Sequence, residues 1–160
     1  MNDEQKNPMT QTGYETLQEE LRHLVEEERP GVVAAIAEAR SHGDLSENAE
    51  YHAAKERQSF IEKRIAELEE KVRCAQVIDI SLISGDDIKF GATVILVDDE
   101  SGDEIQYKIV GSDEADVKRG LLSITSPLAR ALIGKKVGND VEVAIPSGSR
   151  SYYIQRVQYI

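Results

Sequence analysis

Two carboxylates stand three residues apart in a short polar stretch that interrupts a long helical pattern, His42-Gly-Asp-Leu-Ser-Glu47. The glycine before Asp44 favours a turn at this point. Carboxylate oxygens are ligands that Mg²⁺ prefers, and this ion often takes only one or two of them, together with water and substrate phosphates. Asp44 and Glu47 would therefore form half of a site for a hard cation, which a partner molecule would have to complete.

The same spacing also fits a helix cap. Asp44 at the N-cap would accept a hydrogen bond from the backbone N–H of Glu47, and the Glu47 carboxylate would accept one from the N–H of Asp44. Both negative charges would also favour the positive end of the helix dipole. Capping is the commoner role of a bare Asp-x-x-Glu pattern, so the spacing alone does not identify a metal ligand.

The residues on either side of this turn show helical periodicity. Thr12-Gly-Tyr-Glu15 has the form of a capping box and predicts the start of a first helix. Pro30 lies inside the apolar pattern and predicts a kink or short break at Arg29–Pro30, because proline removes a backbone donor and its ring clashes with the preceding turn. A second helix is expected to begin just after Asp44. Its apolar positions have the four-three-four spacing of a coiled-coil seam: Ile61, Ile65, Leu68 and Val72. Packed as an antiparallel hairpin, the two helices would bury both seams and place the acidic turn at the tip.

The chain changes character near residue 80, where turn residues and short β-branched runs replace the helical pattern. Ser126-Pro127 is expected to open a short helix, with serine as the N-cap and proline at the first helical position. The predicted strands are 93–97, 105–110, 121–125, 140–145 and 152–157. The predicted fold class is α+β: a disordered extension at 1–9, an antiparallel helical coiled-coil hairpin at 10–80, and an antiparallel sheet domain with one short helix at 81–160.

Composition restricts the classes of function. Acidic residues outnumber basic ones by 30 to 19, and the net charge is −11. Stand-alone binding to DNA or RNA is not expected, because phosphate neutralisation by basic residues supplies most of such affinity. No membrane association and a cytoplasmic location are expected, since the chain lacks a bilayer-spanning apolar run and a signal-peptide pattern. Cys74 is the only cysteine, which excludes an internal disulfide and a cysteine-rich zinc site.

Long motifs across the chain resemble the bacterial Gre transcript-cleavage factors. The first runs from Ala34 to Arg40 and continues through His42-Gly-Asp-Leu45 and Glu47-Asn-Ala-Glu-Tyr-His-Ala-Ala-Lys-Glu56. Further matching segments are Ala75–Asp79, Phe90–Val94, Ile109–Asp116 and Ser126–Gly134. The resemblance spans nearly the whole chain from Thr10 to Ile160, and it implies a coiled-coil hairpin joined to an FKBP-like C-terminal domain.

The resemblance also implies a mechanism. Gre factors insert their hairpin into the secondary channel of a backtracked RNA polymerase, where the tip stimulates endonucleolytic cleavage at the 3′ end of the nascent RNA. The family's acidic pair falls on Asp44 and Glu47, which would share a Mg²⁺ with the polymerase. A monomer is expected, with no Mg²⁺ bound to the free protein and no activity alone. Ser126 and Pro127 would contact the rim of the channel. The alternative is a non-cleaving regulator that binds the same channel.

Further tip residues take roles from the resemblance alone. Arg40 and Lys55 lie at positions that are basic in the family and would guide RNA, although each is about equally well explained as a solvated helix charge. Asn48 and Tyr51 would support the tip. Ser46 stands where a lysine is common in the family, so one positive charge near the RNA is missing here.

Overall fold

The computed structural model describes residues 6–44 and 47–160 of the 160-residue chain. Internal contacts divide the chain into two units. Among the described residues, one unit spans 14–75, and the other combines 6–13 with 76–160. The change of unit thus falls a few residues before the boundary predicted near residue 80. Within the described ranges, no helix is long and apolar enough to cross a membrane.

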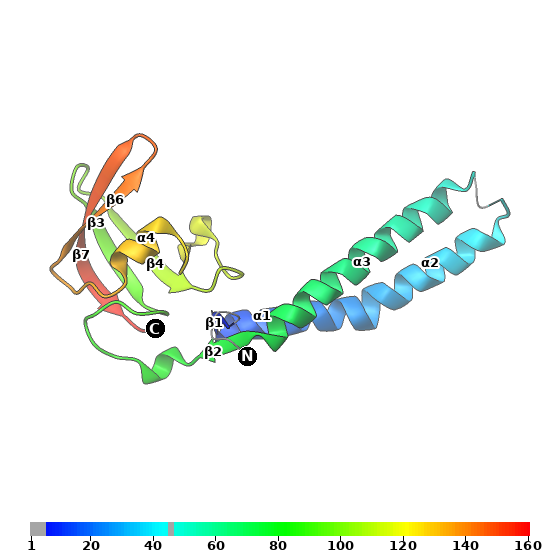
Figure 1. Cartoon of the computed structure of the whole chain (residues 1–160), viewed down its shortest axis with the longest axis horizontal. Helices are drawn as coiled ribbons and strands as arrows, with labels where there is room; N and C mark the ends of the chain where they lie inside the picture. The colour runs from blue at the N-terminus through cyan, green and yellow to red at the C-terminus, as the bar shows by residue number, and fades with distance from the viewer. Residues whose placement is uncertain (1–5, 45–46) are drawn as a thin grey trace. The chain divides into compact units, whose positions relative to one another are not determined.

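The helical unit is a hairpin of two arms, as predicted (Figure 1). The first arm consists of α1 (Gln11–His23), the π-helical turn η2 (Leu24–Glu28) and α2 (Arg29–Ser41). The second arm is α3 (Ala49–Arg73). Helices α2 and α3 lie side by side and run in opposite directions, so the acidic turn between them is at the hairpin tip.

The seam between the arms is the predicted apolar stripe. Val32, Ile61 and Ile65 form its buried core, and Leu68 farther along α3 is fully buried. Leu21, Leu24, Val25 and Ile36 pack against this core. Full burial of each such side chain contributes about 1.5–3 kcal/mol, which an isolated amphipathic helix would not gain.

The interruption predicted at Pro30 is present as a π-helical turn. Pro30 lies in the first turn of α2, directly after η2. The N–H of Arg29 donates to the carbonyl of Leu24, a bond one residue longer than that of an α-helix. The wider turn accommodates a residue that cannot donate a backbone hydrogen bond, so the helix is widened at this point and not broken.

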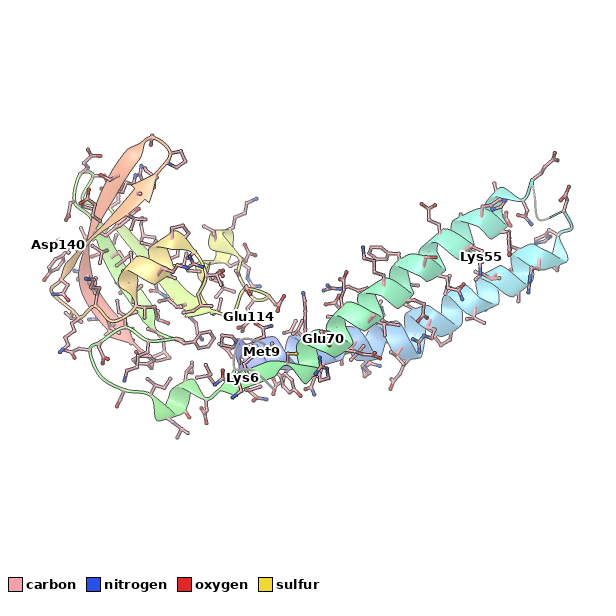
Figure 2. The ribbon with its side chains drawn as sticks, viewed as in Figure 1. Lys6, Met9, Lys55, Glu70, Glu114 and Asp140 are labelled. Carbon is pink, nitrogen blue, oxygen red and sulfur yellow. The ribbon has the colours of Figure 1, made fainter. Side chains whose placement is uncertain are left out.

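Helix α1 begins two residues earlier than predicted. Its N-cap is Thr10, whose hydroxyl accepts a hydrogen bond from the N–H of Gly13 at 3.1 Å, so the predicted cap at Thr12 is wrong. The carboxylate that completes this cap comes from Glu114, 104 positions away, beside Met9 in Figure 2. Glu114 accepts from the N–H of Thr10 at 3.1 Å and from its hydroxyl. A distant glutamate therefore does what the third helical residue does in a local capping box.

Residues 7–10 form a strand, so the predicted disorder of residues 1–9 is wrong for residues 7–9. Strand β1 (Asn7–Thr10) pairs with β2 (Ala75–Ile78), and Met9 is only 1% exposed. A Cβ on Gly111 would lie 2.3 Å from the carbonyl oxygen of Pro8, so this close approach requires glycine. Residues 1–5 lie outside the described part of the chain. The order of β1 depends on residues more than 60 positions away, which a local pattern cannot reveal.

The second unit contains a five-stranded sheet in the order β5-β4-β3-β7-β6, within the described residues. The strands are β3 (Thr93–Asp98), β4 (Glu104–Val110), β5 (Leu121–Ser123), β6 (Asp140–Ile145) and β7 (Gly148–Gln158). All neighbouring pairs are antiparallel except β4 and β5, which are parallel, so the fully antiparallel prediction is wrong at this edge. The connection at residues 111–120 runs back beyond the end of β4 before β5 begins. Leu121 therefore pairs with Lys108, and the two strands run in the same direction.

One short helix, α4 (Pro127–Leu132), packs against this sheet. As predicted, Ser126 is its N-cap and Pro127 occupies the first turn. The most deeply buried core residues are Ile88, Ala92, Val94, Leu96, Ile109, Ala129, Leu132 and Ile154. They come from the strands, from α4 and from the segment before β3. The predicted α+β class is confirmed, as a mostly antiparallel sheet with one short helix.

Replacement of Glu114 tests its role as the distant cap. Glu114→Ala leaves the N–H groups of Thr10 and Gly111 without their acceptor, so we expect the free energy of unfolding to fall by about 1–3 kcal/mol. Urea denaturation measures this change. Glu142→Ala, at an exposed glutamate of β6, is the control. Equal unfolding midpoints for the two variants would contradict the assignment.

Two glutamates of the π-helical turn bond to His23, which predicts that the stability of the fold depends on pH. The pKa of His23 lies above its usual value of 6.5, chiefly because its ring is hydrogen-bonded to Glu27 at 2.8 Å and secondarily to Glu28. The folded state therefore favours the protonated ring, and this stabilisation is complete below about pH 6.5 and lost as pH rises through the folded-state pKa. We expect Glu27→Gln to lower the His23 pKa in an NMR titration.

Glu26→Gln is the matched control for that titration, because Glu26 pairs with Arg22 and lies in the same turn. An unchanged His23 pKa in Glu27→Gln would show that this hydrogen bond does not hold the charged ring.

Candidate functional site at the hairpin tip

The described residues at the hairpin tip surround an open depression of about 430 Å³. Asp44 and Glu47 both line it, together with His42, Asn48, Ala49 and Glu50. Both predicted carboxylates are exposed to solvent. The structure therefore brings Asp44 and Glu47 to one accessible surface. Ser46 lies outside the described residues, and the effect of its missing positive charge stays a prediction.

Helix α3 is capped by neither predicted carboxylate. It begins at Ala49, and its N-cap is Asn48, whose Oδ1 accepts a hydrogen bond from the N–H of Tyr51 at 3.0 Å. The prediction that this helix starts just after Asp44 is wrong, and so is the capping-box interpretation of Asp44 and Glu47. Asparagine caps a helix as well as aspartate does. Helix α3 therefore does not use either carboxylate as its N-cap, and a metal-binding role of the two stays a prediction.

The Asn48 side chain also joins the two arms of the hairpin. Its Nδ2 donates a hydrogen bond of 2.7 Å to the carbonyl oxygen of Ala39 in the last turn of α2. The two bonds fix the orientation of the amide, because only Oδ1 can accept from Tyr51 and only Nδ2 can donate to a carbonyl. The sequence suggested Asn48 as tip support, but neither bond was predicted from it.

The predicted RNA-guiding residues lie on the helices that lead to the tip. Arg40 is exposed in the last turn of α2. Lys55 is exposed on α3, where its Nζ donates to Oε1 of Gln58 at 3.3 Å (Figure 2). At about 1.5 Å per residue, Lys55 is roughly 10 Å along the helix from the cap. Neither residue is among the described residues that line the depression.

Tyr51 is half-buried in the first turn of α3. Its backbone N–H makes the cap with Asn48, and its ring meets the edge of the His52 ring at a centroid distance of 5.6 Å. Glu50, one residue earlier, lines the depression and was not singled out from the sequence. Its position three residues after Glu47 was the signal available.

The donor set suits a shared metal ion better than a complete protein site. Within the described residues, no group of three or more His, Cys, Asp or Glu side chains could hold a metal ion. Asp44 and Glu47 offer carboxylate oxygens, the donor type that Mg²⁺ prefers, but octahedral Mg²⁺ takes more ligands than two side chains provide. The remaining oxygens would have to come from water, substrate or another protein.

The predicted polymerase contact belongs to the sheet unit. Ser126 is half-buried, and its Oγ donates to the carbonyl of Ser123 at 2.7 Å and accepts from the N–H of Ala129 at 3.2 Å. Pro127 beside it is exposed. The Ser126 hydroxyl therefore has a structural role in starting α4, and a partner contact at this turn stays a prediction.

The chain thus combines two units: a helical hairpin with two carboxylates at its tip, and a mostly antiparallel sheet with one short helix. Residues 7–77 match the family model for the N-terminal part of a transcription elongation factor. Residues 83–159 match the model for the C-terminal part of GreA/GreB. The chain belongs to the GreA/GreB family of transcription elongation factors.

Known GreA proteins are similar in sequence to this chain over nearly its full length. The chain is 63% identical over 155 residues to the transcription elongation factor GreA of Acidiphilium cryptum, covering 97% of this chain and 99% of that protein. It is 60% identical over 156 residues to GreA of Phenylobacterium zucineum, covering 98% and 99%. The crystal structure of GreA factor homolog 1 (Gfh1) of Thermus thermophilus has 28% identity, covers 96% of this chain and 99% of that one, and gives a TM-score of 0.44. The family resemblance indicated by the motifs is confirmed, and both of these relatives carry the name GreA.

Because Asn48 is the N-cap of α3, its substitution should lower stability more than substitution of Asp44 or Glu47. We expect Asn48→Ala to lower the free energy of unfolding by about 1 kcal/mol, because the Tyr51 N–H loses its acceptor. Asp44→Ala and Glu47→Ala should each lower it by less than Asn48→Ala does, because neither carboxylate is the N-cap of α3. Urea denaturation followed by the helical signal compares the three variants. A loss in Asp44→Ala as large as that in Asn48→Ala would restore the capping interpretation.

Proposed function

We propose that this transcription elongation factor inserts its hairpin tip into the secondary channel of a backtracked RNA polymerase and stimulates Mg²⁺-dependent endonucleolytic cleavage of the 3′ end of the nascent RNA. Membership in the family implies an interaction with RNA polymerase. One observation carries the proposal: Asp44 and Glu47 line the same exposed depression at the tip, while Asn48 caps the helix. The carboxylates are therefore presented at the tip without being required to start α3.

The dimensions of the hairpin support the insertion step. Helix α3 has 25 residues, which at about 1.5 Å per residue make it nearly 40 Å long. The tip is therefore far from the base of the hairpin, and the hairpin there is only two helices wide. Such an element can enter a narrow channel that would exclude a globular domain.

The proposed chemistry is divided between the two proteins. Two Mg²⁺ ions in a phosphodiester-cleaving site supply water activation and stabilisation of the leaving oxygen. In the proposal the polymerase's own aspartates would hold one ion, and Asp44 and Glu47 would supply oxygen ligands to the second. These two side chains would bind and orient the second ion, and the polymerase would hold the RNA. The net charge of −11 agrees with this division, because the chain itself need not bind nucleic acid tightly.

Two further contacts belong to the proposal. Arg40 and Lys55, exposed on the two arms near the tip, would guide the extruded RNA toward the carboxylates. Pro127, exposed beside the capped Ser126, would contact the rim of the secondary channel. We further propose that the factor works as a cytoplasmic monomer, since one hairpin serves one channel.

Cleavage by a purified, backtracked elongation complex tests the proposal. With Mg²⁺ present, the wild-type protein should release short 3′ RNA fragments. We expect Asp44→Asn and Glu47→Gln to lower the cleavage rate by at least about 10–100-fold, in line with losses at metal sites, while the affinity for the polymerase stays unchanged. Gel analysis of the labelled RNA gives the rate, and competition binding gives the affinity.

Glu142→Gln, in the sheet unit, is the matched control and should cleave as the wild type does. Binding of the wild-type protein without any cleavage would identify a non-cleaving channel regulator. Absence of binding to the polymerase would reject both functions.

A further inference from the structure

We propose that Asn48 is the positioning residue of the tip: its side-chain amide holds the ends of α2 and α3 together and so fixes Asp44 and Glu47 in the arrangement that cleavage needs. The inference rests on the proposed function of the tip. It assigns to Asn48 a role that goes beyond capping a helix.

The two hydrogen bonds of Asn48 have main-chain partners on different arms. Nδ2 donates to the carbonyl of Ala39 on α2 at 2.7 Å, and Oδ1 accepts from the N–H of Tyr51 on α3 at 3.0 Å. A main-chain atom inside a helix moves only if the helix moves. The amide therefore couples the positions of the helices themselves, which a contact between two flexible side chains would not do.

The bond to Ala39 closes a short loop that contains both carboxylates. Asp44 and Glu47 lie between Ala39 and Asn48, and the bond spans nine positions. The carbonyl of Ala39 also accepts from the N–H of His42 at 3.2 Å, so the same atom marks the end of α2. Closing a loop at both ends restricts the conformations of the residues within it. Catalytic groups must be held within about 0.5 Å of their productive geometry, so this restriction matters for a metal-binding pair.

The chemistry of the amide distinguishes positioning from capping. Aspartate and serine cap a helix about as well as asparagine, and aspartate also gains from the helix dipole. If Asn48 were only a cap, either replacement would serve. Neither can reproduce the second bond, because an ionised carboxylate has no donor and the serine side chain is too short to serve both arms. The bond to Ala39 is thus the one feature that requires an amide here.

The test compares Asn48→Ser and Asn48→Asp with the wild type. Both variants should keep the helical signal and the protection of the Tyr51 amide against hydrogen exchange, because the cap remains. Both should bind the polymerase within about twofold of the wild-type affinity. The maximal rate of RNA cleavage should fall by about 10-fold or more, since a displacement of 1 Å can cost about 100-fold. Agreement between the two variants shows that the added charge of aspartate is not the cause.

A second readout uses the free protein and no metal. Spin labels at the exposed positions Glu38 and Glu56 report the separation of the arms near the tip, in a Cys74→Ser background. We expect the distance distribution to broaden in both Asn48 variants. The control is Asp79→Ala, which removes the cap of a 3₁₀ turn in the sheet unit and should leave the distribution unchanged.

The outcomes separate the inference from the function on which it rests. Wild-type cleavage rates and an unchanged distance distribution in both variants would show that Asn48 is a cap only. A rate that falls only together with helix content or polymerase affinity would also overturn the positioning role. If the wild-type protein itself does not cleave, the proposed function fails and the inference fails with it.

Discussion

The apolar seam between α2 and α3 is the constraint on which the tip depends. Each arm has a polar outer face, so neither would be a stable helix alone in water. Burial of Val32 against Ile61 and Ile65 joins the arms and sets their antiparallel register. Once this register is set, the residues between the helices must form the tip. The position of the two carboxylates therefore follows from packing that contains none of the functional residues.

Ion pairs across the seam support the same register. Arg64 pairs with Glu20 at 2.7 Å, and Arg29 pairs with Glu62 at 2.8 Å. The hydrogen bond from Arg29 is the main cause of the lowered pKa of Glu62. Solvent screens exposed pairs of this kind, so they contribute little and the apolar seam supplies most of the stability. The pairs instead favour this register, because a shift of one arm along the other would separate the partners.

At the tip, one side chain joins the two arms while the two carboxylates stay exposed. Asn48 caps α3 and bonds to the last turn of α2, and it lines the open depression together with Asp44 and Glu47. In the proposed function the two carboxylates would supply part of a shared active site, and membership in the GreA/GreB family implies an interaction with RNA polymerase. The sheet unit has its own core and its own capped helix.

Periodicity and composition in the sequence were sufficient to predict the hairpin, its seam, most strands and the acidic pair, because each depends on residues close together in the chain. The tertiary structure decided the start of α3 at Asn48, the cap of α1 by Glu114, and the parallel pairing of β5. The start of α3 was predicted wrongly because the Asp-x-x-Glu spacing of Asp44 and Glu47 is also the spacing of a helix cap. The others depend on contacts between segments far apart in the sequence, and a hydrogen bond across 104 positions leaves no local pattern to read.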